Sequence, residues 1–539
     1  MSNLAWLAAR LSHARIERET TRRLASLREQ PVLLSQQQAR ELLLRLRNEP
    51  GPKVRLGETS WGEPVDVPLA ELVRACALMT GGMGSGKTMA ACVLLDAIVS
   101  LMPQLRSLSF GVLDAKGELF DRALFLLARR LEALEGRARE ELLSRIEIID
   151  FSAREAVSPY NILARWKHTE QDFFVMSRLE TLRELLPSGE KLSLRGTSVL
   201  KHALTLLSEF NLPLTHLTRV LESQAFRAKL IARSKQPDVR AYFGRHFAQE
   251  AKATIGALRT RMDSLFASEG VRLALSGWTA PDFRQLQDEG KVVLVNCAGQ
   301  TITRGVRLLL QGLVLSDIRQ AIFSRPNNPP VSYLWLADEA QNFFLTRQQQ
   351  ADTADILTMG RSFGSFFCFL CQNVAAAIPD ARILEILHTN TRWSLTLRGS
   401  PRDAQFLRAA LPATGRRLRP EPHPFRERTY YSPEEERALL LEGVANLPDR
   451  VGYLWLKTRA REALQITTPT LTLPEGEAFR RVVESLRAEP RLGHRILRSA
   501  YDRQMLERDR EWLDHAEEQS DLGQTFEKKY AEARNSWQP

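Results

Sequence analysis

The chain has 539 residues, of which 44% are hydrophobic and 26% are charged, as in an ordinary globular protein. This composition excludes a mostly disordered, collagen-like or coiled-coil chain, and the length suggests three or four folding units at roughly 150 residues each. Lys and Arg total 75 against 64 Asp and Glu, so the formal net charge is +11. A basic surface favours polyanions such as nucleic acid, although a general arginine bias would explain this charge equally well.

The first 55 residues are predicted to form a basic helical arm, which ends at the segment Pro50–Pro52. The start of this arm is rich in arginine and has no continuous apolar segment, so no signal peptide is expected. The longest uncharged run, between Arg361 and Asp380, is interrupted by polar residues and a proline, so no membrane span is expected either. Five scattered cysteines fit a reducing compartment. We therefore expect a cytoplasmic protein, attached to the inner membrane at most peripherally.

Beyond the arm, short apolar runs alternate with helical stretches such as Lys87–Leu101 and Glu118–Ala133, a pattern typical of an α/β fold with a parallel sheet. Residues 56–164 and 286–470 are predicted to form this α/β domain. Leucines at helical spacing predict an all-α insertion at 165–285, and residues 471–539 are expected to be a helical tail that is solvated or binds a partner. The predicted strands are Ala75–Thr80, Ser107–Asp114, Ile146–Asp150, Val292–Asn296, Ser332–Ala337 and Ser365–Cys371, with Trp393–Leu397 and Gly452–Leu456 as further candidates.

The strongest motif matches G-x-x-x-x-G-K-[ST] in full and lies between a predicted strand and a predicted helix. Its residues are Gly81, Gly82, Met83, Gly84, Ser85, Gly86, Lys87 and Thr88. Glycines allow a tight turn whose backbone N–H groups hold phosphate oxygens, and the following helix adds the positive end of its dipole. In such a P-loop, Lys87 reaches the β and γ phosphates of ATP and the Thr88 hydroxyl binds Mg²⁺. The fold class is therefore expected to be that of a RecA-like P-loop NTPase.

A second motif is the acid pair Asp338-Glu339, which directly follows the apolar run Ser332–Ala337. An apolar strand that ends in two acids is typical of the Walker B segment. Asp338 is expected to hold the Mg²⁺ shell, and Glu339 to orient and polarise the attacking water. Many strands end in two acids, so the pair gains its meaning from the P-loop upstream.

Arg361 and Gln372 flank the next predicted strand and are further candidates for catalysis. A glutamine at this strand end can sense the γ-phosphate, and an arginine on a ring interface can stabilise a neighbour's γ-phosphate. A structural role explains either residue equally well. A basic stretch downstream is a candidate for contacts with DNA phosphates, although a solvated surface loop is the favoured explanation. Its residues are Arg416, Arg417, Arg419, Arg426 and Arg428.

Together the motifs resemble the type IV coupling proteins, which are the TraG/TraD-like ATPases of conjugation and type IV secretion within the HerA/FtsK-type ring motors. Besides the P-loop, the matching segments are Val112–Leu119, Ser158–Asn161, Asp338–Phe343, and Gly360–Gly364 followed by Gln372. Ala115 and Ile162 stand where the family usually has proline. The resemblance covers residues 55 to about 460 and implies that Arg361 acts in trans and that Gln372 is the coupling residue.

By this resemblance, the chain is expected to be an ATP-driven ring translocase, hexameric in the manner of the family, that moves DNA through non-specific phosphate contacts. Relaxase or secretion-channel proteins would be its partners. Family members usually begin with two transmembrane helices, whereas a basic arm stands in their place here. Two alternatives remain open: a HerA-like motor for DNA processing or defence, and a nucleotide-switched platform that recruits secreted proteins.

Overall fold

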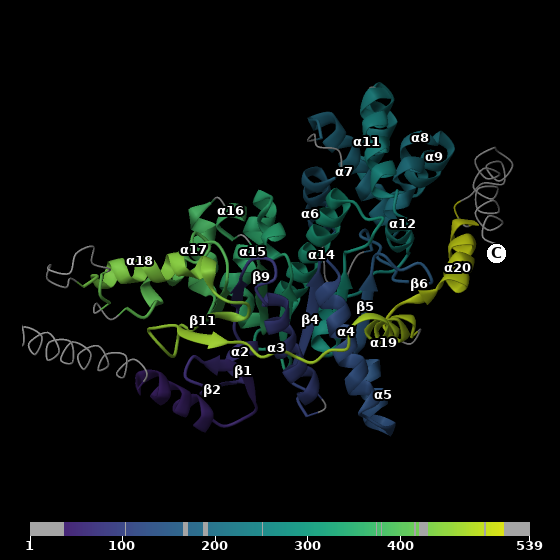
Figure 1. Ribbon diagram of the computed structural model, residues 1–539. Helices are drawn as coiled ribbons and strands as arrows, with labels where there is room; N and C mark the ends of the chain where they lie inside the picture. The colour runs from purple at the N-terminus through teal and green to yellow at the C-terminus, as the bar shows by residue number, and fades with distance from the viewer. Residues whose placement is uncertain are drawn as a thin grey trace, which may run out of the picture. The chain divides into compact units, whose positions relative to one another are not determined.

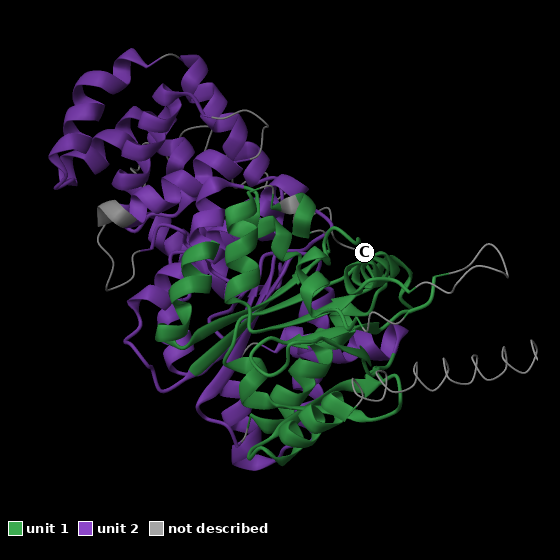
Figure 2. Ribbon diagram, turned by 90° about the vertical axis from the view of Figure 1, so that its left-hand side faces the viewer, with its two compact units in different colours: residues 1–102, 332–345, 353–474 green, residues 103–331, 346–352, 475–539 purple. Residues whose placement is uncertain are grey.

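The computed structural model describes residues 37–102, 104–164, 171–186, 192–250, 252–372, 374–378, 380–413, 417–419, 430–489, 492–510 and 512. The chain divides into two compact units, each assembled from segments that are distant in the sequence (Figure 2). Unit 1 contains residues 1–102, 332–345 and 353–474, and unit 2 contains residues 103–331, 346–352 and 475–539. Within the described part of the chain, no helix combines the length and the hydropathy that a membrane span requires.

Unit 1 is built on a mixed sheet (Figure 1). Its strands are β1 (Lys53–Thr59), β2 (Pro64–Pro68), β3 (Ala77–Thr80), β8 (Ser332–Ala337), β9 (Ser365–Cys371), β10 (Trp393–Leu397), β11 (Val451–Leu456) and β12 (Leu464–Thr467). They lie in the order β2-β1-β12-β11-β10-β3-β9-β8. Strands β10, β3, β9 and β8 are parallel, and the pairs from β10 to β2 are antiparallel. The parallel strands therefore place their carboxyl ends at one edge.

The parallel strands are the ones that the sequence predicts best. Every residue of β3 and β9 is buried, because strands covered on both faces consist of nearly continuous apolar residues. The antiparallel part includes β1, which the sequence pattern missed. Helix 37–48 agrees with the expected arm, but residues 53–55 begin strand β1, so the helical prediction is wrong there. Burial in β1 largely alternates, and this pattern gives no continuous apolar run.

Helices surround the unit 1 sheet, and the most important for the site is α3 (Lys87–Leu101), which directly follows the P-loop. The others are α2 (Leu69–Val73), α16 (Val374–Ala377), α17 (Ala381–Asn390) and α18 (Pro433–Gly443). Helix α15 (Arg347–Met359) has residues in both units. Helix α18 begins with a capping box between Ser432 and Glu435, and α17 begins at an Asp380 side chain that accepts from the Arg382 N–H.

Unit 2 contains a parallel sheet of three strands in the order β4-β7-β5. They are β4 (Leu108–Asp114), β7 (Val292–Asn296) and β5 (Ile146–Asp150). Each strand is wholly buried and ends in a polar residue, namely Asp114, Asn296 or Asp150. The helices next to these strands in the chain are α4 (Glu118–Glu132), α5 (Gly136–Ser144), α13 (Phe283–Asp288) and α14 (Arg304–Ser324).

The leucine-rich part of unit 2 is helical, as the spacing predicts, and its described residues between Val157 and Val292 form no strand. Its helices are α6 (Gln171–Leu185), α7 (Leu194–Glu209), α8 (Leu217–Glu222), α9 (Gln224–Arg233), α10 (Pro237–Ala241), α11 (Lys252–Leu265) and α12 (Glu269–Ser276). A buried ion pair between Arg178 and Asp317 joins α6 to α14. Asp317 also accepts from the Tyr160 hydroxyl. The expected domain boundaries themselves stay a prediction.

The last described segment of the chain, from Gly476, is part of unit 2 and packs on the rest of that unit. It forms α19 (Gly476–Ala488), the short strand β13 (Ile496–Leu497) and α20 (Arg498–Arg510). Phe479 of α19 stacks on Phe125 of α4, with 5.2 Å between ring centroids. Strand β13 pairs with β6 (Ala156–Val157), and the Tyr501 hydroxyl of α20 donates to the Leu273 carbonyl at 2.6 Å. The described tail is therefore docked on its own chain, whereas the sequence predicted a solvated or partner-binding helix.

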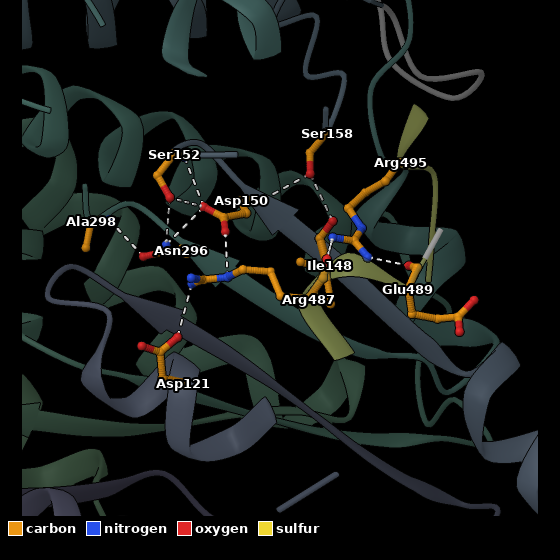
Figure 3. Close-up of polar contacts among 10 residues, drawn as sticks. All are labelled: Asp121, Ile148, Asp150, Ser152, Ser158, Asn296, Ala298, Arg487, Glu489 and Arg495. Atoms are coloured by element: carbon orange, nitrogen blue, oxygen red, sulfur yellow. Dashed lines mark hydrogen bonds and ion pairs between the residues drawn. The ribbon is translucent and has the colours of Figure 1, made fainter. Parts of the chain in front are cut away.

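Arg487 anchors this tail at the carboxyl ends of β5 and β7 (Figure 3). Its Nη2 donates to Asp121 Oδ1 at 3.0 Å, and its Nε lies 3.2 Å from Asp150 Oδ2. Asp150 is 1% exposed, and its Oδ1 accepts from Asn296 Nδ2 at 3.0 Å and from Ser152 Oγ at 2.6 Å. Removal of the tail would leave this buried carboxylate without its cation.

Candidate nucleotide site

The P-loop connects the end of β3 to the start of α3 in unit 1. Gly84 and Gly86 have φ angles of +73° and +96°, which only glycine adopts readily. A Cβ atom at Gly81 would lie 2.5 Å from Ser85 Oγ, so the loop folds too tightly for a side chain there. The motif glycines are thus explained by backbone geometry, and this geometry is the one that turns successive N–H groups into one concavity.

Lys87 is buried, with 6% of its surface exposed, and its Nζ donates to the Gly81 carbonyl at 3.3 Å. The ammonium group thus lies over the loop to which it belongs. Thr88 follows in the first turn of α3, where the N-terminal end of the helix dipole favours an anion. Met83 is 84% exposed at the outer part of the loop. A cation, a hydroxyl group and a helix start therefore converge on the loop.

The acid pair lies at the same sheet edge as the P-loop, with one strand between them. Thr80 of β3 is level with Cys371 of β9, and Ala337 of β8 is level with Phe369. Leu78 of β3 is also level with Phe369, and neighbouring strands are about 4.8 Å apart, so the backbones of Leu78 and Ala337 are about 10 Å apart. Asp338 and Glu339 directly follow Ala337, and the P-loop directly follows Thr80, so both begin at this edge.

Electrostatic effects on Cys371 support this proximity. Burial raises the pKa of its thiol to about 12, Lys87 lowers it, and Glu339 and Asp338 raise it. One strand end therefore lies within the fields of the lysine and of both acids. Asp338 is itself only 3% exposed. A buried carboxylate and the Thr88 hydroxyl supply the oxygen ligands that Mg²⁺ prefers, so these residues fit the metal.

Glu339 is held by two glutamine side chains. Gln372 Nε2 donates to Glu339 Oε1 at 2.6 Å, and Gln341 Nε2 donates to Glu339 Oε2. The Gln372 backbone N–H also donates to Gln341 Oε1 at 3.4 Å. Glu339 has a φ of +50°, an uncommon conformation for a residue other than glycine. The sequence predicted a role for Gln372 but not for Gln341. The one feature of the sequence that could have indicated Gln341 is its position two residues after Glu339.

Arg361 lies in a short 3-10 turn, Gly360–Phe363, and is exposed. Among the described residues, its guanidinium has no hydrogen bond or ion pair. The structure therefore does not bring Arg361 to the acids of its own chain. Two apolar side chains are also exposed near the ends of α15: Leu345, which precedes the helix, and Met359, its last residue, are each 46% exposed.

The sequence also missed two segments that enclose the P-loop. Arg398 directly follows β10, and its carbonyl accepts from the Gly82 N–H at 2.7 Å. Arg450 directly precedes β11, and its N–H donates to the Ser85 carbonyl at 2.9 Å. The side chain of Arg450 lies against Gly86, where a Cβ atom would come within 2.8 Å of Arg450 Cγ. These contacts depend on β10 lying beside β3, which a linear pattern does not reveal.

The two other motif segments lie in unit 2 and have structural contacts. Asp114 is wholly buried, and its carboxylate accepts from the N–H groups of Lys116 at 2.7 Å and Phe120 at 2.8 Å. It therefore shapes the turn into α4, and burial raises its pKa. Tyr160 is buried and donates to Asp317.

The basic stretch is only partly described. Arg416, Arg426 and Arg428 lie outside the described residues. Arg419 Nη2 contacts both carboxylate oxygens of Glu435, at 2.5 and 2.7 Å, and its guanidinium lies 5.3 Å from the centre of the Tyr431 ring. Arg419 is thus engaged within its own chain.

Comparison with solved structures finds the bacterial conjugative coupling protein TrwBdeltaN70 in complex with sulphate, at 15% identity and a TM-score of 0.50. The match covers 81% of this chain and 94% of that one. TrwB in complex with ADP and Mg²⁺ matches at 15% identity and a TM-score of 0.49, over 84% and 94% of the two chains. VirB4 of Thermoanaerobacter pseudethanolicus matches at 12% identity and 0.49, over 78% and 98%.

No protein-family model matches the chain. No curated protein matches it either. The likeness to TrwBdeltaN70 concerns the fold. The chain has the α/β P-loop NTPase fold of that conjugative coupling protein, which confirms the expected fold class and, at the level of the fold, the resemblance that the motifs carry.

Proposed function

We propose that the chain is an ATPase that binds ATP with Mg²⁺ in the P-loop and hydrolyses it with the help of the acid pair. The observation that carries this proposal is the convergence of the P-loop and Asp338-Glu339 at one edge of the unit 1 sheet. Lys87 would contact the β and γ phosphates, and Thr88 and Asp338 would hold the metal. Bound Mg²⁺ would neutralise charge that develops on the phosphates.

Glu339 would orient the attacking water and accept its proton, since a carboxylate is the usual base in this position. Gln372 and Gln341 fix the carboxylate from both sides. TrwB has been solved in complex with ADP and Mg²⁺ and with a non-hydrolysable ATP analogue, which are ligands of the kind that we propose here.

The test is binding and turnover of ATP by the purified chain and by its Lys87→Ala variant. We expect the variant to lose ATP turnover, because the buried ammonium group that neutralises the phosphates is gone. Lys201→Ala is the matched control, since Lys201 is exposed in the helical part of unit 2. Turnover by Lys87→Ala equal to that of the control would refute the site.

We further propose that the ATPase is a ring motor of conjugative transfer or type IV secretion that moves DNA. The exposed Arg361 supports this part, because a guanidinium that has no partner among the described residues is available to a neighbouring subunit. The exposed Met359 offers apolar surface two residues before it in the sequence. The conjugative coupling protein TrwBdeltaN70 has a similar fold, and a hexamer is the arrangement that the motif resemblance implies.

ATP turnover with and without DNA tests this second part. A DNA motor is expected to hydrolyse ATP faster when single-stranded or duplex DNA is added, and its DNA affinity should fall steeply with salt if phosphate contacts dominate. Turnover that ignores DNA and rises with a protein partner would instead favour a recruitment platform. Electron microscopy with a non-hydrolysable ATP analogue would count the subunits.

A further inference from the structure

Arg398 is fixed against the P-loop by its backbone. It directly follows β10, which is the neighbour of β3 on the side away from β9. Its carbonyl accepts from the Gly82 N–H at 2.7 Å. The next residue, Gly399, is so close that a Cβ atom there would lie 3.5 Å from Gly81 Cα and from the Gly82 nitrogen. The start of the Arg398 side chain therefore cannot drift away from the phosphate-binding loop.

The guanidinium of Arg398 lies at the outer part of the same loop. Its Nη2 is 3.9 Å from the position that a Cβ atom would take at Gly84. The same Nη2 lies 2.7 Å from Asp449 Oδ1. The side chains of Arg398 and Asp449 are 37% and 64% exposed, so water weakens this ion pair strongly. Asp449 thus holds the guanidinium beside the loop through a contact that another anion can replace.

We propose that Arg398 is a nucleotide-binding residue that acts in its own subunit and exchanges the Asp449 carboxylate for the terminal phosphate of ATP. This inference rests on the proposed ATPase function. A triphosphate carries more negative charge than one carboxylate, and a guanidinium binds phosphate oxygens in a bidentate manner. Lys87 is the only cationic side chain within the P-loop itself, so Arg398 would supply a second positive charge from the same chain.

This role differs from that of Arg361. Arg398 sits beside the loop of its own chain through the Gly82 contact, whereas Arg361 is proposed to reach a neighbour's nucleotide. Arg398 should therefore affect nucleotide affinity even in an isolated subunit. Because it lies beside the outer part of the loop, the third phosphate should feel it more than the first two.

The test is titration of the full chain with fluorescent ATP and ADP analogues in the presence of Mg²⁺. For Arg398→Ala we expect ATP affinity to fall about 10- to 100-fold, the range for loss of hydrogen bonds to a charged group, and ADP affinity to fall less than about threefold. Arg398→Lys should restore part of the ATP affinity, and Asp449→Asn should leave it unchanged or increase it. Arg402→Ala is the matched control, since Arg402 is exposed four residues along.

Arg398→Ala with ATP affinity within about twofold of the control would overturn the inference. An equal loss of ATP and ADP would also overturn it, because that result would mean that the arginine only maintains the shape of the loop. The melting temperature of each variant checks that it folds, and Arg398→Lys keeps the charge if the alanine variant is unstable. If the unchanged chain and Arg402→Ala bind neither nucleotide, the proposed ATPase function itself fails.

Discussion

Glu339→Gln should nearly abolish ATP hydrolysis while preserving ATP binding. The change keeps the side-chain volume but removes the charge that attracts the water proton. Loss of a general base typically lowers turnover about 10²- to 10⁴-fold, which corresponds to about 2.7–5.4 kcal/mol of barrier. The new amide also meets two amide donors, from Gln372 and Gln341, so it can accept only one of the two present hydrogen bonds.

Gln372→Ala separates the role of the base from that of its support. It removes the 2.6 Å hydrogen bond to Glu339 Oε1 and leaves the one from Gln341. A hydrogen bond to a charged group is worth about 1.5–3 kcal/mol, so turnover should fall about 10- to 150-fold. In the double variant, Glu339→Gln with Gln372→Ala, turnover should be no lower than in Glu339→Gln alone, because groups that act as a unit are not additive.

The assay is steady-state phosphate release at saturating ATP, together with nucleotide titration of each variant. Gln285→Ala is the matched control, since Gln285 Nε2 also donates to a glutamate, Glu289 Oε1, at 2.6 Å, but at an exposed position of unit 2. Turnover by Gln372→Ala within twofold of this control would show that the glutamine does not support the base. If the turnover of the double variant fell by the product of the two single losses, that result would contradict the coupling between Glu339 and Gln372.

Three further changes test other parts of the molecule. Arg361→Ala should bind ATP but not hydrolyse it. Mixing the variant with wild-type subunits should restore part of the ATP turnover of the variant. Mixed samples in which turnover is not restored would contradict action in trans. Arg178→Met should lower the free energy of unfolding by about 3–5 kcal/mol because it leaves Asp317 buried without its cation, and denaturant melts should show that adding Asp317→Asn recovers most of this loss. The Glu147 carboxylate raises the pKa of His494, so the charged imidazole stabilises tail docking below about pH 6.5 and this stabilisation is lost as pH rises through the raised pKa. His494→Ala should therefore speed limited proteolysis of the tail at about pH 6 and have little effect near pH 9. Equal effects at both pH values would show that the charge on His494 does not stabilise tail docking.

The strands that carry the site were predictable because they are buried on both faces. Ser332–Ala337 and Ser365–Cys371 are strands with the bounds that their apolar runs predict. The P-loop was predictable for a related reason, since its glycines are required locally by positive φ angles and by the tight fold at Gly81. Both signals lie within a few consecutive residues.

The missing features depend on contacts between distant segments. Arg398 reaches the P-loop only because β10 pairs with β3, more than 300 residues earlier in the chain. The Gln341 side chain is joined to the residue after the neighbouring strand, because its Oε1 accepts from the Gln372 N–H. Strand β1 was missed because its pairing with β2 and β12 needs only partial, alternating burial. The docking of the tail through Arg487 likewise follows from complementary charges that periodicity does not encode.

The docked tail has a practical consequence for protein production. A stop codon placed before Gly476 would remove α19, β13 and α20 together. It would expose Phe125, remove the antiparallel partner of Ala156–Val157 and leave the Asp150 carboxylate without the Arg487 cation. Trp512 also contacts the ring of Phe210, and its carbonyl accepts from Lys229 Nζ at 3.2 Å. Shortened versions designed to crystallise more readily should therefore keep every residue through Trp512, and an affinity tag belongs beyond that point.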